Sequence, residues 1–534
     1  MQTCYQLIWL AAERTPDRLA MVDDASHRQF TYAELISEIE TVAAGLAGRG
    51  IGKGTRVATA LPPLFDHGVL ILALQRLGAV PALLNFRLTA DDLADLIAEG
   101  GIKAAVIQPG EELLAAVTAA LPESAMILTM DASYGDRRDD AAALGPLPNL
   151  HPDDPAFIFY TSGTTGLPKG VVMAQKTTEH RVLWLSTQAG LRHGGHLRTL
   201  GFMPISHAIG FYGVFLVTLA MNGTYFVQSV FNPAEANDMV ERHEITYMFA
   251  VPQLYFAMTA APNYDLKKMK SLELTLYGGA EIVPALLDRM AAEWGGAVRH
   301  IYGTTETMCS LYNPDPVGQP TRLRPGFYSR TRIIQLDGGP NDRVAPGEEG
   351  ELIVDATIDT IFTEYLNRPD DTQDKLKDGW YYTGDICLLH GDGDVDLIGR
   401  ADDMIRSGGE HIHPSEVEPV LGSHAGVAEA AVIGITDAKW GQMVVACIFG
   451  GEAEADARVL GAHMRNSGLA GFKRPKAYVM FVPCRATRRA RCCGANYGPR
   501  WKRPGMAKTG WNSPRYEAAP LEYYSIRPRM PRLR

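Results

Sequence analysis

Cysteine is scarce in this sequence, and its distribution fits neither a disulfide scaffold nor a metal site. The 534 residues contain seven cysteines, an odd number, at scattered positions. Disulfide-stabilised secreted domains are small and cysteine-rich, and structural zinc sites use cysteines at short fixed spacings. Since neither pattern is present, we expect reduced thiols and a cytoplasmic location.

The sequence also has no long apolar run, and we expect no secretory signal peptide. Its first residues, MQTCYQLIWLAAERTPDR, have neither a basic start nor a small-residue cleavage site. The most apolar segment, residues 211–227, is interrupted by Thr218, Asn222 and Thr224. Because a membrane-spanning helix needs about 20 predominantly apolar residues, we interpret this segment as buried core and expect no membrane partner.

Acidic residues outnumber basic ones in the chain as a whole, whereas the C-terminal end is basic. The chain has 51 Lys and Arg against 61 Asp and Glu, a formal net charge of −10. Residues 484–534 contribute 13 Lys and Arg and 2 Asp and Glu, so the preceding residues carry −21. A body this acidic does not fit nucleic-acid binding. The remaining alternative is a basic arm at residues 484–534, which would bind DNA in a salt-sensitive way.

What the sequence does contain is a long alternation of strand-like and helix-like segments. Strand-like runs at residues 56–61, 79–84 and 104–108 alternate with helix-like segments at residues 66–78 and 89–98. Further strand-like runs lie at residues 199–203, 224–228, 246–250 and 272–277. This pattern is typical of parallel sheets joined by crossover helices. Near the start of the chain, Thr31 and Glu34 form a predicted capping box for an amphipathic helix over residues 29–48.

The pattern changes near residue 347, where GEEGELIVD and HGDGDVDLIGR are typical of antiparallel hairpins. A charged turn at residues 400–403 then leads into a short α+β unit with a helix capped by Ser415 and the strand EAAVIGI. The predicted fold is therefore α/β, with two parallel-rich sheets and a small antiparallel subdomain in a large domain, followed by a smaller, mobile α+β domain. The predicted boundaries are 1–401 for the large domain, 402–482 for the small one and 483–534 for a disordered basic tail.

A loop rich in glycine and hydroxyl groups, within FYTSGTTGLPKGV, directly follows the apolar run at residues 156–159. Backbone N–H groups without bulky side chains, together with hydroxyl groups and Lys169, suit an anion such as phosphate. The spacing is not that of a P-loop, because Lys169 follows Leu-Pro and precedes Gly170. The loop therefore predicts a phosphate site of a different class.

TSGTTGLPKG resembles the phosphate loop of the adenylate-forming superfamily, which includes acyl-CoA synthetases, luciferases and nonribosomal adenylation domains. Three further blocks appear in that family's order: YGTTE at 302–306, YYTGD at 381–385 and GRADDMIRSGGEHIHPSEVE at 399–418. The resemblance covers about residues 1–482. The strings FIFYTSGTTGLPK, STQAGLRHG, IYGTTETMCSLY and FKRPK are most similar to the 4-chlorobenzoate:CoA ligases.

The resemblance implies a two-step reaction that uses ATP, Mg²⁺ and CoA. A carboxylate is a poor electrophile, and transfer to AMP supplies a leaving group that a thiol then displaces. The implied catalytic residues are Glu306, which supports Mg²⁺ as the metal ligand, His207, Lys169 and Thr304. The implied ATP site consists of Thr161, Ser162, Gly163, Thr164, Thr165, Gly166 and Lys169 at the β- and γ-phosphates, Gly279, Ala280 and Glu281 beside adenine, Tyr302, Gly303 and Thr304 near the α-phosphate, and Asp385 and Arg400 at the ribose.

The acyl pocket implied by the resemblance contains no cation, so we expect no second carboxylate or phosphate on the acid. Its mixture of aromatic and small apolar residues suits a flat apolar acid better than a long alkyl chain. His207 corresponds to an aromatic gate in the relatives. The implied pocket residues are Trp184, His207, Ala208, Ile209, Phe249, Ile301, Met308 and Cys309.

The resemblance also implies a hinge at Asp402, about which the small domain rotates between the two half-reactions. For CoA it implies an aromatic sandwich around adenine, cations at the phosphates and glycines beside the pantetheine arm. The implied CoA residues are Arg87, Gly408, Gly409, Trp440, Phe472, Arg474 and Lys476.

The chain departs from the family at its end. Family members carry a block of the form P-x-N-A-x-G-K-(V/I)-L-R-R, whose lysine contacts the substrate carboxylate and the α-phosphate. Here the sequence reads PCRATRRARCCGANYG from residue 483. One choice of synonymous codons for residues 483–498, read in a shifted frame, yields the missing block, with its lysine codon straddling those of Ala490 and Arg491. We therefore interpret the tail as frameshifted.

Together these patterns predict an ATP-dependent aryl acid:CoA ligase acting on 4-chlorobenzoate or a related halobenzoate. Benzoate or hydroxybenzoate ligation is the alternative within the class, and FKRPK and Trp440 favour CoA over a carrier protein. A second alternative is a catalytically impaired relative that binds nucleotide or acyl-adenylate, since the lysine block is missing. The predicted partners are small molecules and a second copy of the chain in a homodimer.

Overall fold

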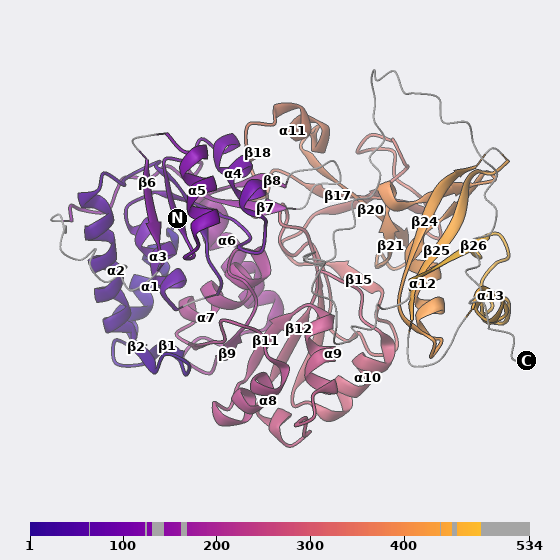
Figure 1. Ribbon diagram of the computed structural model, residues 1–534, viewed down its shortest axis with the longest axis horizontal. Helices are drawn as coiled ribbons and strands as arrows, with labels where there is room; N and C mark the ends of the chain where they lie inside the picture. The colour runs from indigo at the N-terminus through magenta and orange to yellow at the C-terminus, as the bar shows by residue number, and fades with distance from the viewer. Residues whose placement is uncertain are drawn as a thin grey trace, which may run out of the picture.

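The computed structural model describes most of the chain, and within the described residues the strands form three sheets (Figure 1). These residues are 1–63, 65–122, 125–130, 144–161, 168–437, 439–450 and 456–481. Among them, no helix combines the length and apolar character needed to cross a bilayer. The tail predicted to be disordered, residues 483–534, lies outside the described part of the chain.

The first sheet contains the segments predicted between residues 56 and 108. Its strands are β3 (Arg56–Ala60), β4 (Val80–Leu83), β5 (Ala104–Ile107), β6 (Met126–Thr129), β7 (Pro155–Thr161), β8 (Lys169–Ala174) and β18 (Glu364–Tyr365). Their order is β18-β8-β7-β4-β3-β5-β6, parallel from β7 to β6, with β8 antiparallel to both neighbours. The crossover helices are α3 (Phe65–Arg76), α4 (Ala90–Glu99) and α5 (Glu111–Ala120). The predicted alternation is therefore confirmed.

The second sheet has a parallel centre and also carries the strands predicted for it. Its strands here are β1 (Leu19–Asp23), β2 (Arg28–Thr31), β9 (Arg198–Gly201), β10 (Thr224–Val227), β11 (Tyr247–Ala250), β12 (Leu274–Tyr277) and β13 (Ala297–Tyr302). The parallel order is β1-β10-β9-β11-β12-β13, and β2 pairs antiparallel with β1. Parallel strands bring their carboxyl ends to one edge, where ligands bind in open α/β sheets.

Helices pack around these two sheets and form the main apolar core with them. They are α1 (Cys4–Arg14), α2 (Tyr32–Gly48), α6 (Gln175–Ala189), a π-helix (Ile209–Leu216), α7 (Val217–Ala220), α8 (Pro233–Arg242), α9 (Pro252–Ala260), a 3₁₀ turn (Lys268–Ser271) and α10 (Pro284–Glu293). The capping box predicted at the start of α2 is confirmed, because the Thr31 side chain accepts from Glu34 N and the Glu34 carboxylate accepts from Thr31 N. The apolar segment from residue 211 is buried, as predicted.

The strands beyond β13 are antiparallel, as predicted, but they continue the second sheet. They are β14 (Leu311–Asn313), β15 (Arg322–Pro325), β16 (Thr331–Ile334), β17 (Glu349–Asp355), β19 (Leu376–Lys377), β20 (Trp380–Leu389) and β21 (Val395–Arg400). Strand β15 pairs with both β14 and β21, which joins the two regions. This pairing satisfies backbone groups that an open sheet edge would leave without partners.

A smaller C-terminal domain follows the 3₁₀ turn at Ala401–Asp403 and appears in orange and yellow in Figure 1. It contains β22 (Ile405–Ser407), β23 (Glu410–Ile412), α12 (Pro414–Gly422), β24 (Val427–Asp437), β25 (Gly441–Gly450), α13 (Ala457–Asn466) and β26 (Ala477–Phe481). Both helices contribute to an apolar core of its own with the sheet. The predicted mixed fold of a large and a smaller domain is confirmed.

The prediction that Ser415 caps the first helix of this domain is wrong. The N-cap is His413, whose backbone N donates to Glu416 Oε2 at 3.4 Å. Pro414 occupies the first helical position, where its missing N–H costs nothing, so the cap must be the residue before it. Ser415 Oγ instead donates a hydrogen bond to Ile398 O, on β21 of the large domain. Ser415 therefore links the two domains.

Candidate active site

A cavity of about 680 Å³ lies between the two large sheets. It opens at the carboxyl ends of β11, β12 and β13 and beside the connection from β7 to β8. Sequence-predicted residues in its lining are Arg87, Thr161, Lys169, His207, Ala208, Ile209, Phe249, Gly279, Ile301, Gly303, Thr304, Glu306, Met308, Cys309, Arg400 and Asp402. The structure thus brings together residues from segments that are far apart in the sequence.

Glu306 is a buried carboxylate whose orientation is fixed by a tyrosine that sequence reasoning missed. It is 7% exposed, and its Oε1 accepts a hydrogen bond of 2.8 Å from Tyr365 Oη. Glu306 O accepts a second bond of 2.9 Å from Phe362 N. At the start of the turn, Gly303 is required, because a Cβ there would lie 1.5 Å from Met308 O. The turn therefore presents the Glu306 carboxylate to the cavity in a fixed position.

Arg181, on α6, donates hydrogen bonds to the backbone of the turn that carries Glu306. No pattern in the sequence identified this residue. Its side chain is fully buried. Its Nε donates to Thr360 O at 2.9 Å, and its Nη2 donates to Thr305 O and Glu306 O, both at 3.0 Å. One guanidinium thus ties the turn that carries Glu306 to the segment that leads to Tyr365. Only a planar group with several donors can satisfy these acceptors together.

Replacing Arg181 with Met should lower the free energy of unfolding by about 2–4 kcal/mol, because Thr305 O and Thr360 O lose the guanidinium donor and Glu306 O keeps only Phe362 N. Urea denaturation followed by circular dichroism measures this change. Arg324→Met is the matched control, since Arg324 is 48% exposed and its ion pair with Asp394 spans 3.3 Å. Loss of such an exposed pair costs about 1 kcal/mol or less. Equal stability of Arg181→Met and the wild type would contradict this role.

Lys169 lines the cavity and forms an ion pair with an acidic residue. Its Nζ lies 2.8 Å from Asp371 Oδ1 and 5.2 Å from the centre of the Tyr365 ring. Thr161 ends the preceding strand and also lines the cavity. The predicted phosphate-loop residues between them, Ser162, Gly163, Thr164, Thr165 and Gly166, lie outside the described residues.

Asp385 is not one of the residues that line the cavity, and it accepts a hydrogen bond from Tyr302. Tyr302 Oη donates this hydrogen bond to Asp385 Oδ2. Tyr302 is predicted to bind nucleotide, but it is absent from the cavity lining. Arg400 Nε lies 3.7 Å from Asp385 Oδ1. Burial raises the pKa of Asp385, while Arg400, the Tyr302 hydrogen bond and Lys375 oppose this shift. Asp385 Oδ1 therefore lies close to the guanidinium group of Arg400, which lines the cavity.

The apolar end of the cavity contains seven of the eight predicted acyl-pocket residues. The exception is Trp184, which is buried but absent from the lining; a Cβ on Gly326 would lie 2.4 Å from its ring. The pKa of His207 is lowered by burial and then by Arg87, which favours the neutral imidazole. Burial raises the pKa of Cys309 to about 12, so this residue is a neutral thiol. This end of the cavity therefore combines apolar surface with neutral polar groups.

On the adenine side, the structure places only Gly279 of the three predicted residues in the lining. Ala280 and Glu281 follow it outside the cavity. The pKa of Glu281 is raised by burial first and then by Glu418 of the small domain. Gly279 has a φ of 77°, a conformation that favours glycine.

The predicted CoA residues divide between the cavity and the small domain. Arg87 lines the cavity, whereas the other six are absent from its lining. Gly408 N donates to Trp440 O at 2.8 Å, which holds two of them together, and Trp440 and Phe472 are 41% and 42% exposed. Arg474 and Lys476 both donate to carbonyl groups of the loop before them. Asp402, the predicted hinge residue, lies in the short turn between the domains and lines the cavity.

The cavity can hold a ligand with an anionic part and an apolar part. Its lining includes the cations Lys169 and Arg400 and the hydroxyl of Thr304, together with the apolar side chains of Phe249 and Ile301. Among the described residues there is no group of three or more acidic, His or Cys side chains that could hold a metal by itself. The Glu306 carboxylate does fit Mg²⁺, which is commonly bound by one or two carboxylates together with substrate phosphates and water.

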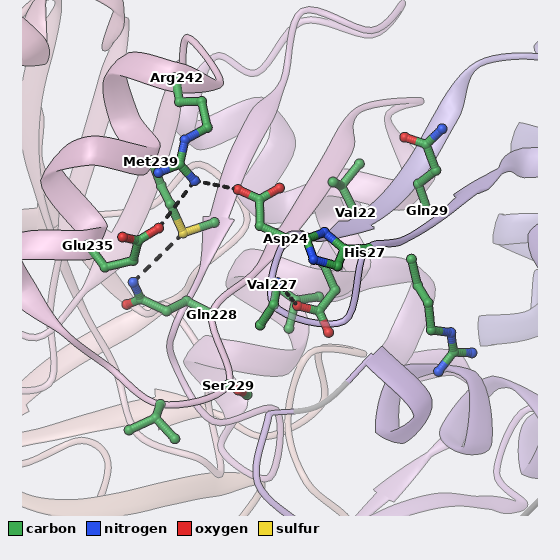
Figure 2. A pocket seen from close by; sticks show the side chains of 14 residues that line it. Val22, Asp24, His27, Gln29, Val227, Gln228, Ser229, Glu235, Met239 and Arg242 are labelled. Atoms are coloured by element: carbon green, nitrogen blue, oxygen red, sulfur yellow. Dashed lines mark hydrogen bonds and ion pairs between the residues drawn. The ribbon is translucent and has the colours of Figure 1, made fainter.

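A second cavity, of about 850 Å³, lies between the β1–β2 turn, the end of β10 and α8 (Figure 2). The cation Arg242 in its lining is already paired, because its Nη1 lies 2.6 Å from Asp24 Oδ2 and 3.2 Å from Glu235 Oε1. His243 Nε2 also lies 2.7 Å from Asp24 Oδ2. Because these partners satisfy one another, we place the active site in the first cavity.

Comparisons with known proteins agree with the geometry. The family model described as "AMP-binding enzyme" matches residues 8–366, and the model "AMP-binding enzyme C-terminal domain" matches residues 416–490. The chain is 42% identical over 480 residues to a 4-chlorobenzoate--CoA ligase of Arthrobacter sp, covering 90% of this chain and 91% of the relative. It is 38% identical over 491 residues to the enzyme of that name from Pseudomonas sp. (strain CBS-3), covering 90% of each.

Solved structures show the same similarity. ATP-bound MatB from Rhodopseudomonas palustris superposes with a TM-score of 0.81 at 26% identity, covering 90% of this chain and 95% of that one. The o-succinylbenzoate CoA synthetase of Bacillus subtilis, in complex with its acyl-adenylate intermediate, gives a TM-score of 0.79 at 25% identity, with coverages of 90% and 94%.

Proposed function

The chain belongs to the AMP-binding enzyme family, and we propose that it is an ATP-dependent aryl acid:CoA ligase whose acid is 4-chlorobenzoate or a related halobenzoate. In the first step the acid carboxylate attacks the α-phosphorus of ATP, forming the acyl-adenylate and releasing pyrophosphate. In the second, the CoA thiol attacks the acyl carbon and AMP leaves, which gives the aryl-CoA thioester.

The observation that carries the choice of acid is the chemistry of the apolar end of the cavity. Phe249, Ile301 and Met308 give it apolar surface, and none of the eight residues predicted for the acyl pocket is a cation, although Arg87 lines the same cavity and lowers the pKa of His207. A ring with one apolar substituent buries well among these side chains, whereas a second carboxylate there would lose hydration. The two 4-chlorobenzoate ligases named above support the same choice.

The proposed roles rest on the resemblance to the family, and the positions of the side chains are compatible with them. Thr304 donates to the α-phosphate, and Lys169 exchanges its ion pair with Asp371 for the terminal phosphates of ATP. Asp385 and Arg400 bind the ribose hydroxyls, since a carboxylate matches a vicinal diol. Glu306 would hold Mg²⁺, which supplies charge stabilisation to the departing pyrophosphate. Neutral His207 lies beside the acid carboxylate without repelling or protonating it.

For the second step, the small domain would rotate about Asp402 and bring Gly408 and Gly409 to the cavity. Trp440 and Phe472 would hold the adenine of CoA between them, and Arg87, Arg474 and Lys476 its phosphates. The large exposed fractions of Trp440 and Phe472 support this, because exposed aromatic side chains are suited to binding another ring.

The proposal is tested by a thioester assay on a panel of acids at equal concentration, with ATP, Mg²⁺ and CoA. We expect kcat/KM for 4-chlorobenzoate to exceed that for benzoate by about tenfold, since filling an apolar pocket with one further group is worth about 1–3 kcal/mol. Dodecanoate and terephthalate should be poor substrates. Preference for benzoate or 4-hydroxybenzoate would favour the alternative acids, and activity only with alkyl acids would contradict the proposal.

We further propose a cytoplasmic location, supported by the reduced state of all four described cysteines, Cys4, Cys309, Cys387 and Cys447, each of which is buried. A homodimer is the proposed assembly, and sedimentation equilibrium measures it directly.

A further inference from the structure

Lys375 is a cation at the edge of the active-site cavity that no motif identifies. It ends α11 (Pro369–Lys375), lines the cavity and is half-buried. Within the part of the chain that the structure describes, its ammonium group has no hydrogen bond and no ion pair within 4 Å. The ammonium group of Lys375 can therefore interact with a bound ligand or with charged groups of the active site.

The ammonium group lies over the turn that carries the proposed ribose ligand. A Cβ on Gly384 would lie 3.3 Å from Lys375 Nζ and 3.3 Å from Arg400 Nη2. Gly384 also has a φ of 77°, which favours glycine. Two cations therefore converge on the residue next to Asp385, and the missing side chain makes room for both.

Asp385 is buried, and the Tyr302 hydroxyl donates a hydrogen bond to its Oδ2. The groups that face it are Tyr302 on β13, Arg400 on β21, Lys375 on α11 and Glu306 on the turn after β13. Burial raises the pKa of Asp385, Glu306 raises it further, and the other three lower it. Lys375 also lowers the pKa of Glu351, whose carboxylate accepts from Gly384 N.

We propose that Lys375 is a positioning residue for the nucleotide: with Arg400 it flanks Asp385 and keeps that carboxylate in the form that accepts both ribose hydroxyls. This inference rests on the proposed function, in which Asp385 binds the ribose. Lys375 acts through Asp385 and has no direct contact with the phosphates. The contribution of Lys375 to the affinity for AMP should therefore depend on the ribose hydroxyls and on the protonation state of Asp385.

The test is calorimetric binding of AMP to the full chain, with 2′,3′-dideoxy-AMP as the comparison ligand. At pH 6, Lys375→Gln should bind AMP about five- to tenfold more weakly than the wild type, while both should bind 2′,3′-dideoxy-AMP equally. Loss of the cation raises the pKa of Asp385, so the defect should grow as the pH is lowered and shrink as it is raised. Lys375→Arg should restore binding.

Lys377→Gln is the matched control, because Lys377 is exposed and its Nζ lies 5.6 Å from the centre of the Tyr382 ring, outside the cavity lining. It should bind AMP within about twofold of the wild type. The proposal is overturned if Lys375→Gln binds AMP normally, if its defect is the same for 2′,3′-dideoxy-AMP, or if the defect does not change with pH. AMP binding requires no acid, so failure of the halobenzoate assay leaves this test intact.

Discussion

Replacing Glu306 with Gln should slow acyl-adenylate formation by about 10²–10³-fold, the range measured when one preorganised electrostatic contact is removed from an active site. Gln has the same shape and its amide oxygen still accepts from Tyr365 Oη, so the substitution removes charge and keeps the position. The loss follows from weaker binding of Mg²⁺ at the departing pyrophosphate. Single-turnover release of pyrophosphate from enzyme mixed with ATP and 4-chlorobenzoate measures it.

The matched control is Glu364→Gln, since Glu364 is exposed and directly precedes Tyr365 on β18. Its rate should stay within about twofold of the wild type. Thioester formation from supplied acyl-adenylate should change little in Glu306→Gln, because no pyrophosphate leaves in that step. If both half-reactions slowed equally, Glu306 would have to act on something common to both.

Restoring the shifted reading frame after residue 482 should raise acyl-adenylate formation by about 10²-fold or more over the chain as written. The restored block supplies a lysine that would contact the carboxylate and the α-phosphate, and a charge-assisted contact of this kind stabilises the transition state strongly. Thioester formation from supplied acyl-adenylate should rise by less than about tenfold. Pyrophosphate exchange and thioester assays on the two proteins give both numbers.

The control is a third protein in which the restored lysine is replaced with Ala, and it should return to the adenylation rate of the chain as written. If the chain as written already adenylates as fast as the restored one, the missing block is dispensable. Tight acyl-adenylate binding without exchange in the written chain would support the alternative of an impaired relative. Sequencing the DNA around codons 480–484 separates a natural frameshift from a sequencing error.

Local signals in the sequence were read correctly where local physics decides the structure. The Thr31 capping box formed as predicted because its partners are three residues apart. The same reasoning failed at Ser415, where Pro414 moved the cap to His413 and the serine bonded to Ile398 of the other domain. A cap follows from neighbours in the chain, whereas a domain contact depends on residues brought together by folding.

The groups that sequence reasoning missed are those whose partners lie far along the chain. Arg181 bonds to carbonyl groups 124, 125 and 179 residues away, and Tyr365 bonds to Glu306 across 59 residues. Such pairs leave no spacing to read in a single sequence. Trp184 shows the converse, since its position in the sequence suggested a pocket residue and its packing against Gly326 keeps it out of the lining.

By itself, the sequence determined the α/β fold class and the adenylating chemistry. Both are indicated by contiguous patterns: the alternation of apolar runs indicates the layers, and the blocks at Lys169, Glu306 and Asp385, which carry the resemblance to the family, each span only a few residues. Only the tertiary structure decided which side chains face the cavity and what holds them, such as Tyr365 on Glu306 and Lys375 over Gly384. The direction of a side chain depends on how strands and helices that are distant in the sequence pack together. No short segment of the sequence contains that information.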